Sequence, residues 1–150
     1  MDPPRLAPPV VMDTNVLVAG ACRHGASRAY QVLVAILEGK IPLILTPGIV
    51  LEYQDVLQRP NVLALTGLTH AQSVDLVDEL IHLSREVQIA FQWRPNLHDE
   101  TDNKFVGAAI HAGAVIVTYN VADYRHGDLA RHGWIAMTPD EFTTRYPIES

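Results

Sequence analysis

Carboxylate and amide side chains follow several short apolar segments of this chain. They are Asp13, Glu52, Asp102, Asn120 and Asp123. Each has an ordinary structural explanation on its own, because an Asp can cap a turn or a helix and a lone Glu is usually a solvated helix residue. Taken together they are more informative, since each comes shortly after a predicted strand. If these strands run parallel, the side chains gather at one edge of the sheet.

Gathered carboxylates need a cation. Two ionised carboxylates about 4 Å apart repel each other by about 4 kcal/mol at an effective dielectric constant near 20. A divalent cation removes this repulsion, and a ligand set that contains only oxygen atoms favours Mg²⁺ or Mn²⁺ over zinc. Such an ion can lower the pKa of a bound water and neutralise charge on a phosphate. The acids therefore predict a Mg²⁺ or Mn²⁺ site suited to phosphate chemistry.

The hydropathy pattern predicts strands that alternate with helices. Short apolar or alternating runs predict strands at Val10–Met12, Ile41–Leu45, Val87–Phe91, Ala114–Val117 and Trp134–Met137. Caps, prolines and helical spacing predict helices from Ser27 to Gly39, from Pro47 to about Arg59, over Ala71–Leu83 behind a Thr69–Gln72 capping box, from Asp102 to Gly113, and from Pro139. This order implies an α/β fold, a three-layer sandwich whose central parallel sheet is flanked by helices.

Length and composition indicate one globular domain. The 150 residues are 48% hydrophobic, and we expect a domain over residues 10–146 between a flexible N-terminus (1–9) and a short tail (147–150). The single Cys22 excludes an intramolecular disulfide framework and a multi-cysteine zinc site. The sequence has neither an apolar run near the ~20 residues of a membrane span nor a signal-peptide pattern. We therefore expect a cytoplasmic protein that does not enter a membrane.

The net charge of −6 argues against a nucleic-acid partner, because nucleic-acid binding usually needs a basic face. Two small groups of basic residues could bind nucleic acid in spite of this net charge if they border the acidic crevice. One contains Arg23, His24 and Arg28, and the other lies within residues 125–132. Each group can equally be an ordinary solvated loop.

The first two acids resemble those of the PIN-domain family of nucleases. An opening strand followed by Asp13, Thr14 and Asn15 matches the mark of that family, an Asp followed by Thr or Ser and Asn. Glu52, which follows the first predicted helix and a short strand, resembles the second acid of the family. The resemblance extends over about residues 10–143.

Later segments carry the same resemblance in the same order. The run 99–105 (DETDNKF), followed by 114–118 (AVIVT), resembles the third-acid helix of the family and the strand behind it. The closing run 135–142 (IAMTPDEF) is similar to a bacterial subgroup that contains the toxins of toxin–antitoxin pairs, the VapC-like ribonucleases. Each motif alone is weakly specific, whereas the ordered set is a strong signal.

The resemblance implies a ligand set for the metal. Asp13, Glu52 and Asp102 would bind Mg²⁺ or Mn²⁺, and Thr14 or Asn15, together with Thr118, would hold the site together by hydrogen bonds. The fourth acid departs from the fullest pattern, because Asn120 stands where many relatives have Asp. Asp123, three residues further on, is the better candidate for that role, since it keeps the charge.

The resemblance also implies a function. It indicates a metal-dependent endoribonuclease that leaves a 5′-phosphate and a 3′-hydroxyl, with an antitoxin protein as partner and a homodimer as the assembly. Arg23 and Lys104 are candidate substrate contacts, although Lys104 could instead pair with Asp99 or Glu100. RNA is the expected substrate.

Three other functions compete with the nuclease. A PIN scaffold could bind RNA or a protein partner without cleaving it. A phospho-receiver domain needs adjacent acids after the first strand and a lysine after the last, whereas Thr14 and Asn15 follow Asp13 and no lysine follows Thr118. A phosphatase of the haloacid-dehalogenase type would have a second Asp in place of Asn15.

Overall fold

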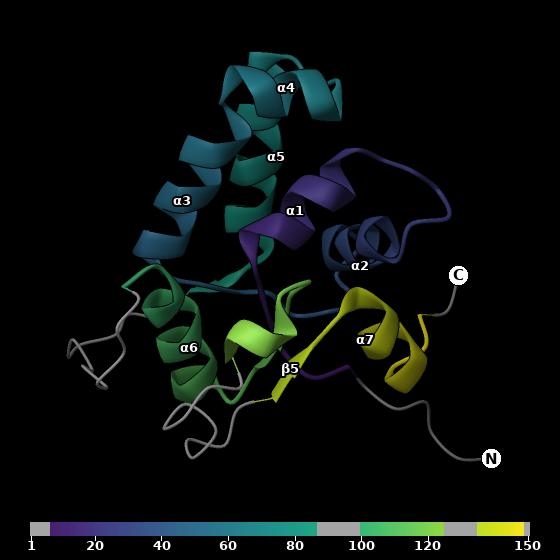
Figure 1. Ribbon diagram of the computed structural model, residues 1–150, viewed down its shortest axis with the longest axis vertical. Coiled ribbons are helices and arrows are strands. Elements are labelled where there is room, and N and C mark those ends of the chain that lie inside the picture. Colours follow the sequence, from purple (N-terminus) through teal and green to yellow (C-terminus); the bar gives the residue numbers. More distant parts are fainter. Residues whose placement is uncertain (1–6, 87–99, 125–134, 149–150) are drawn as a thin grey trace.

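The computed structural model describes residues 7–86, 100–124 and 135–148, without the side chains of residues 86 and 100–103. Within this part, the chain is an α/β sandwich with helices around a central parallel sheet, as predicted (Figure 1). The strands are β1 (Val10–Met12), β2 (Ile44–Leu45), β3 (Arg85–Glu86), β4 (Val115–Val117) and β5 (Ile135–Met137). The helices are α1 (Thr14–Ala21), α2 (Arg28–Leu37), α3 (Pro47–Leu57), α4 (Pro60–Thr66), α5 (His70–Leu83), α6 (Glu100–Ala112) and α7 (Pro139–Arg145), with a 3₁₀ turn η1 (Val121–Tyr124).

The strand order places the carboxyl ends of β1 and β4 side by side. Strands β1, β4 and β5 form one parallel sheet, in which Met12 lies opposite Val117, and β2 pairs with β3 in parallel. A parallel bridge between Val10 and Leu43 sets β2 beside β1 on the side away from β4. The spatial order is therefore β3-β2-β1-β4-β5, and it reverses between β1 and β4. In open parallel sheets, such a reversal is where the crevice for a ligand forms.

Helices cover the sheet on both sides and bury it. Helix α6 packs against β1, β2 and β4, whereas α2 packs against α1, α5 and α7. Figure 1 shows α6 and α2 on opposite sides of the strands. Every residue of β1 and β4 is buried, as expected for a strand covered on both faces. Among the described helices, none has both the length and the apolar composition of a membrane span.

Side-chain caps fix where several helices begin, and those of Ser27 and Thr69 were predicted. Ser27 caps α2 by accepting a bond from the backbone of Tyr30, and Thr69 forms a capping box with Gln72 at the start of α5. A second capping box joins Thr138 to Glu141 in front of α7. These side chains accept bonds from backbone N–H groups that have no partner within the helix, which gives each helix a defined start.

The structure corrects several predicted elements. Helices α1 and α4 were not predicted, and Pro60, expected only to end a helix, is also the first residue of α4. Helix α6 begins at Glu100, so Asp102 lies in its first turn and is not its N-cap. The second strand is shorter than predicted, covering Ile44–Leu45 only. The predicted strand Val87–Phe91 lies outside the described residues.

Candidate functional site

Asp13 lies at the end of β1, where its carboxylate is held by hydroxyl groups. Its backbone occupies the N-cap position of α1 in an extended conformation, but its side chain makes no capping bond. One carboxylate oxygen, Oδ2, instead accepts hydrogen bonds from Thr118 Oγ1 at 2.8 Å and from the phenol of Tyr124 at 3.1 Å. Both donors come from the segment that follows β4, on the other side of the strand reversal. Asp13 is thus anchored across the sheet edge, which is more than a helix cap requires.

The surroundings of Asp13 disfavour its charge. Burial is the largest influence and raises the pKa of its carboxyl above the ordinary value of 3.8. Hydrogen bonds from Thr118, Tyr124 and the Thr14 backbone act in the opposite direction, and the nearby charge of Glu52 raises the pKa further. A half-buried carboxylate beside another acid is a situation in which a bound cation is favourable.

Glu52 reaches the same place from α3. That helix starts at Pro47, with Thr46 capping the backbone of Ile49 at 3.3 Å, so Glu52 lies on its second turn. Its Oε2 accepts a hydrogen bond from the hydroxyl of Thr14, the residue after Asp13. Its Oε1 is paired with Lys104 Nζ at 2.9 Å.

Tyr53 fixes α3 to the end of β1. Its side chain is fully buried, and its phenol donates a hydrogen bond to the carbonyl of Met12, directly before Asp13. Burial, together with the charges of Asp13 and Glu52, raises the pKa of this phenol well above 10.0. Tyr53 therefore stays protonated and holds the two acidic residues in register.

The segment after β4 forms the opposite wall. Thr118 is fully buried, and its Oγ1 also accepts the Asn120 N–H at 3.0 Å. The Asn120 carbonyl in turn accepts the Asp123 N–H at 3.0 Å. The side chains of Asn120 and Asp123 are exposed, and the bonds that fix this turn run through the backbone of both residues. Asn15 contributes to the same wall, because its Oδ1 accepts the Tyr119 N–H at 3.4 Å.

The predicted third ligand, Asp102, lies on the first turn of α6, and its side chain is outside the described part of the structure. Lys104, two residues later on the same helix, contacts Glu52, so this end of α6 lies beside α3. Among the described side chains, no three of His, Cys, Asp and Glu gather closely enough to hold a metal ion. The described acidic pair is Asp13 and Glu52.

The structure shows the surroundings of the two candidate substrate contacts, Lys104 and Arg23. Lys104 pairs with Glu52, and neither of the partners considered from the sequence, Asp99 or Glu100, has a described side chain. Arg23 follows the far end of α1, in a left-handed conformation with φ of 60°. Its guanidinium lies close to Gly67, at the end of α4, away from the start of α1 where Thr14 meets Glu52.

Sequence reasoning missed Tyr53 and Tyr124. Each directly follows a residue that it did identify, Glu52 or Asp123, and that adjacency is the signal that could have revealed them. A residue beside a predicted ligand is held near the site by its backbone, and a tyrosine there can donate its phenol to a carboxylate or a carbonyl.

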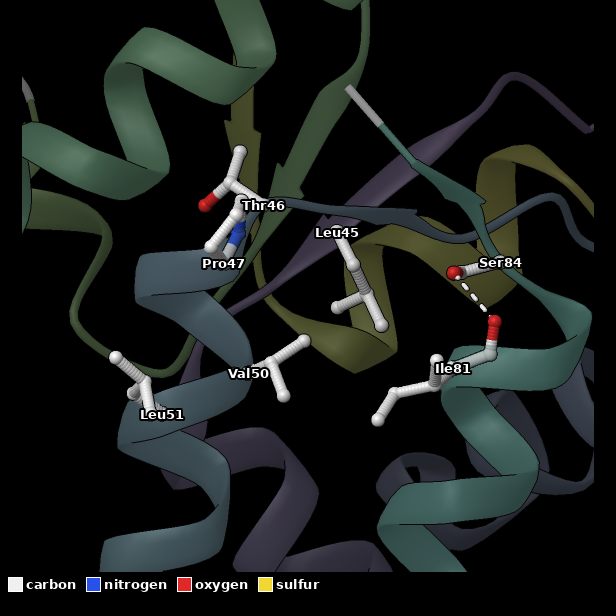
Figure 2. A pocket seen from close by; sticks show the side chains of 7 residues that line it. All are labelled: Leu45, Thr46, Pro47, Val50, Leu51, Ile81 and Ser84. Atoms are coloured by element: carbon white, nitrogen blue, oxygen red, sulfur yellow. Dashed lines mark hydrogen bonds between the residues drawn. The ribbon is translucent and has the colours of Figure 1, made fainter. Parts of the chain in front are cut away.

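A separate pocket opens beside α3. It has a volume of about 330 Å³ and is lined mainly by apolar side chains: Leu45, Thr46, Pro47, Val50, Leu51, Ile81 and Ser84. Figure 2 shows the α3 side chains on one side of it and those from the end of α5 on the other. Glu52 does not line it, so the pocket and the acidic pair use different faces of α3.

The family follows from a comparison of the sequence with known domains. Residues 9–122 match the PIN domain, so the chain belongs to the PIN-domain family. No curated protein matches the sequence significantly. Among solved structures, a chain of VapBC2 from Rickettsia felis, bound to a DNA fragment from its promoter, has a similar fold, with a TM-score of 0.59. The sequences are 13% identical, and the match covers 87% of this chain and 98% of that one.

Proposed function

We propose that this PIN domain is a metal-dependent endoribonuclease and the toxin of a toxin–antitoxin pair. The observation that carries the proposal is the joining of Asp13 and Glu52 at the strand reversal, where hydroxyl groups fix Asp13 and burial opposes its charge. Membership of the PIN-domain family supports nuclease chemistry. A structural role alone would not bring a second acid beside Asp13, where burial already disfavours the charge of the Asp13 carboxylate.

The described residues fit a hard divalent cation. Asp13 and Glu52 offer carboxylate oxygens only, the ligand type that Mg²⁺ and Mn²⁺ prefer. We infer that Asp13, Glu52 and Asp102 hold Mg²⁺ or Mn²⁺, and that Asp123, with Asn120, completes the site when RNA is present. When bound, the ion would supply charge neutralisation at the scissile phosphate and a more acidic water.

The other residues orient this ligand set. Thr118 and Tyr124 both bond to Oδ2 of Asp13 and so set the plane of its carboxylate. Thr14 does the same for Glu52, and the Tyr53 phenol holds α3 against β1. Loss of such a hydrogen bond to a metal ligand commonly lowers metal affinity or activity by about 10- to 100-fold.

Partners and location are part of the proposal. The likeness to a chain of VapBC2 supports an antitoxin partner, which would cover the acidic crevice. A homodimer is the assembly that the resemblance to the PIN-domain family implies. RNA is the proposed substrate and the cytoplasm the proposed location. Because the net charge is −6, we expect RNA to bind well only when the cation is present.

The test is cleavage of 3′-labelled RNA by the purified chain with Mg²⁺, with Mn²⁺ and with EDTA. We expect metal-dependent products that carry 5′-phosphates, and loss of at least about 100-fold in rate for Asp13→Asn and Glu52→Gln. Asp75→Asn, which changes an exposed carboxylate on α5, should cleave like the wild type. Metal-independent cleavage, or equal activity of all four proteins, would contradict the proposal.

A scaffold that binds RNA or a protein partner without cleaving it is the second candidate. The observation that favours it is Asn120, an amide at the position where many relatives carry the fourth acid. RNA binding by wild type and by Asp102→Asn with equal affinity, together with no turnover by either, would support the scaffold.

A further inference from the structure

Both carboxylate oxygens of Glu52 already have partners. Oε2 accepts the hydroxyl of Thr14, and Oε1 lies 2.9 Å from the ammonium of Lys104. The Lys104 and Glu52 side chains are only 28% and 19% exposed, so solvent screens this ion pair less than the surface pairs of the chain. Lys104 comes from α6 and Glu52 from α3, so the pair joins two elements at the site.

The present position of Lys104 opposes the binding of a cation by Glu52. Mg²⁺ binds carboxylate oxygens at about 2.0–2.1 Å. An ammonium hydrogen-bonded to the same carboxylate then lies close to the ion and repels it, and the partly buried surroundings screen this repulsion only weakly. The hydroxyl of Thr14 carries no charge, so it does not repel the ion in this way. Lys104 is therefore the partner of Glu52 that a bound cation disfavours.

The lysine side chain is able to leave. Its stem has four rotatable methylene groups, and it runs past Gly48, at which even an added Cβ would lie 3.7 Å from Lys104 Cδ, an ordinary contact. The ammonium is already partly exposed and is hydrated when it leaves. Movement of this one side chain therefore needs no change in α3 or α6.

We propose that Lys104 is a built-in counter-ion of the acidic site, which neutralises Glu52 in the metal-free protein and is displaced from it by Mg²⁺ or Mn²⁺. This inference rests on the proposed function, because it assumes that the cation binds at Glu52. Lys104 is a positioning residue in this account. It keeps the acidic pair together before metal arrives, and it lowers the affinity of the site for the metal.

The composition of the chain allows a direct measurement. The sequence contains two lysines, Lys104 and Lys40, and each pairs with a glutamate at 2.9 Å. The partner of Lys40 is Glu38, just after α2, and those side chains are 42% and 51% exposed. Lys40 is thus a matched internal control. Protein labelled with ¹³C and ¹⁵N in lysine gives two side-chain NMR signals, and Lys104→Met identifies which belongs to Lys104.

We expect saturating Mg²⁺ to move the Lys104 signal toward the position of a solvated lysine and to leave the Lys40 signal in place. The inference is overturned if Mg²⁺ stabilises the protein in a thermal melt while the Lys104 signal stays unchanged. That outcome leaves the proposed function standing. If neither Mg²⁺ nor Mn²⁺ binds to the wild type at all, the proposed function and the inference both fail.

Calorimetric titration with Mn²⁺ tests the competition separately. Removing an ion pair of this exposure should tighten Mn²⁺ binding by about fivefold in Lys104→Met, because the ion then meets an uncompensated Glu52. Lys104→Arg, which keeps the charge, should bind like the wild type, as should Lys40→Met. Unchanged or weaker Mn²⁺ binding by Lys104→Met, or an equal gain in Lys40→Met, contradicts the inference.

Discussion

At the scale of the residue, the position of the Asp13 carboxylate is set by two hydroxyl groups that donate hydrogen bonds to one of its oxygens. Thr118 and Tyr124 both donate hydrogen bonds to Oδ2. These bonds fix the plane of the carboxylate and therefore also the direction in which Oδ1 points. The site combines this fixed geometry with an unfavourable environment for charge, since burial raises the pKa of Asp13. Asp13 therefore costs stability in the metal-free protein, and this cost can be measured.

Asp13→Asn should unfold at a higher temperature than the wild type in EDTA at pH 7. The amide keeps an oxygen that accepts the bonds of Thr118 and Tyr124, and it removes the buried charge. The pKa of Asp13 is raised in the folded state. The contribution of Asp13 to the free energy of unfolding is therefore fully present below pH 3.8, and it is lost as the pH rises through the folded-state pKa. The difference in melting temperature should therefore shrink on acidification. A constant difference from pH 3 to pH 7 contradicts this explanation.

Tyr124→Phe and Tyr53→Phe separate the two buried phenols of the site. Each removes a buried phenol donor and should destabilise the fold by about 1 kcal/mol. Only Tyr124 donates to a predicted metal ligand, whereas Tyr53 donates to the Met12 carbonyl. Urea unfolding should show similar losses, while calorimetry with Mn²⁺ should show weaker binding mainly in Tyr124→Phe. Equal effects on Mn²⁺ binding would mean that Tyr124 has a structural role only.

At the scale of the element, the starts of α1 and α3 meet at the site. Helix α1 is held in place by its packing against α2. Gly20, near the end of α1, permits this close approach. A Cβ added there would lie 3.0 Å from the Ala29 carbonyl oxygen and 3.2 Å from Leu33 side-chain atoms. The oxygen belongs to the backbone of α2, so it cannot turn away as the end of a side chain can.

Gly20→Ala and Gly48→Ala are a matched pair for this packing. Alanine normally favours a helix over glycine by about 1 kcal/mol. At Gly48 the added Cβ meets only ordinary contacts, so that variant should be as stable as the wild type or slightly more stable. At Gly20 the two helices must move apart, and we expect a loss of about 1–3 kcal/mol in urea unfolding. Stabilisation by Gly20→Ala would show that the interface between α1 and α2 accommodates an added Cβ, which contradicts this explanation.

The sequence predicted the elements that carry their own signals and missed those that depend on tertiary contacts. Helices α2, α5 and α7 have side-chain caps, and the sequence predicted each of them. Helix α1 has no side-chain cap, and its sequence TNVLVAGA contains β-branched residues and glycine, which favour a helix poorly. Packing against α2 and α3 compensates for that weakness.

The same distinction applies to the candidate site. The strand ends are local features, so the sequence alone indicated that Asp13 and Glu52 would lie at one edge of the sheet. The partners are not local, because Tyr124 is 111 residues from Asp13 and the Met12 carbonyl is 41 residues from Tyr53. No periodicity encodes which buried tyrosine donates to which oxygen. Side-chain contacts of that range require the packed core.

At the scale of the whole molecule, the site forms only when the entire sheet forms. Its described contacts join β1, α3, α6 and the segment after β4, so the unfolded chain has no preformed group of ligands. A cation that binds this site binds the folded state almost exclusively. Binding must therefore appear as global stabilisation, with the amount fixed by the affinity and the free concentration of the metal.

We expect Mn²⁺ at 100 times its dissociation constant to stabilise the wild type by about 2.7 kcal/mol, which for a domain of this size raises the melting temperature by about 5–10 °C. Asp13→Asn should start higher in EDTA and gain much less, because it has lost both the repulsion and a ligand. Asp75→Asn, with its exposed carboxylate on α5, should respond like the wild type. If Asp75→Asn also loses the response, the response is not specific to the acidic pair, because one exposed carboxylate changes the net charge of −6 very little. If wild type and Asp13→Asn gain equally, the cation binds elsewhere, and Asp13 serves the fold alone.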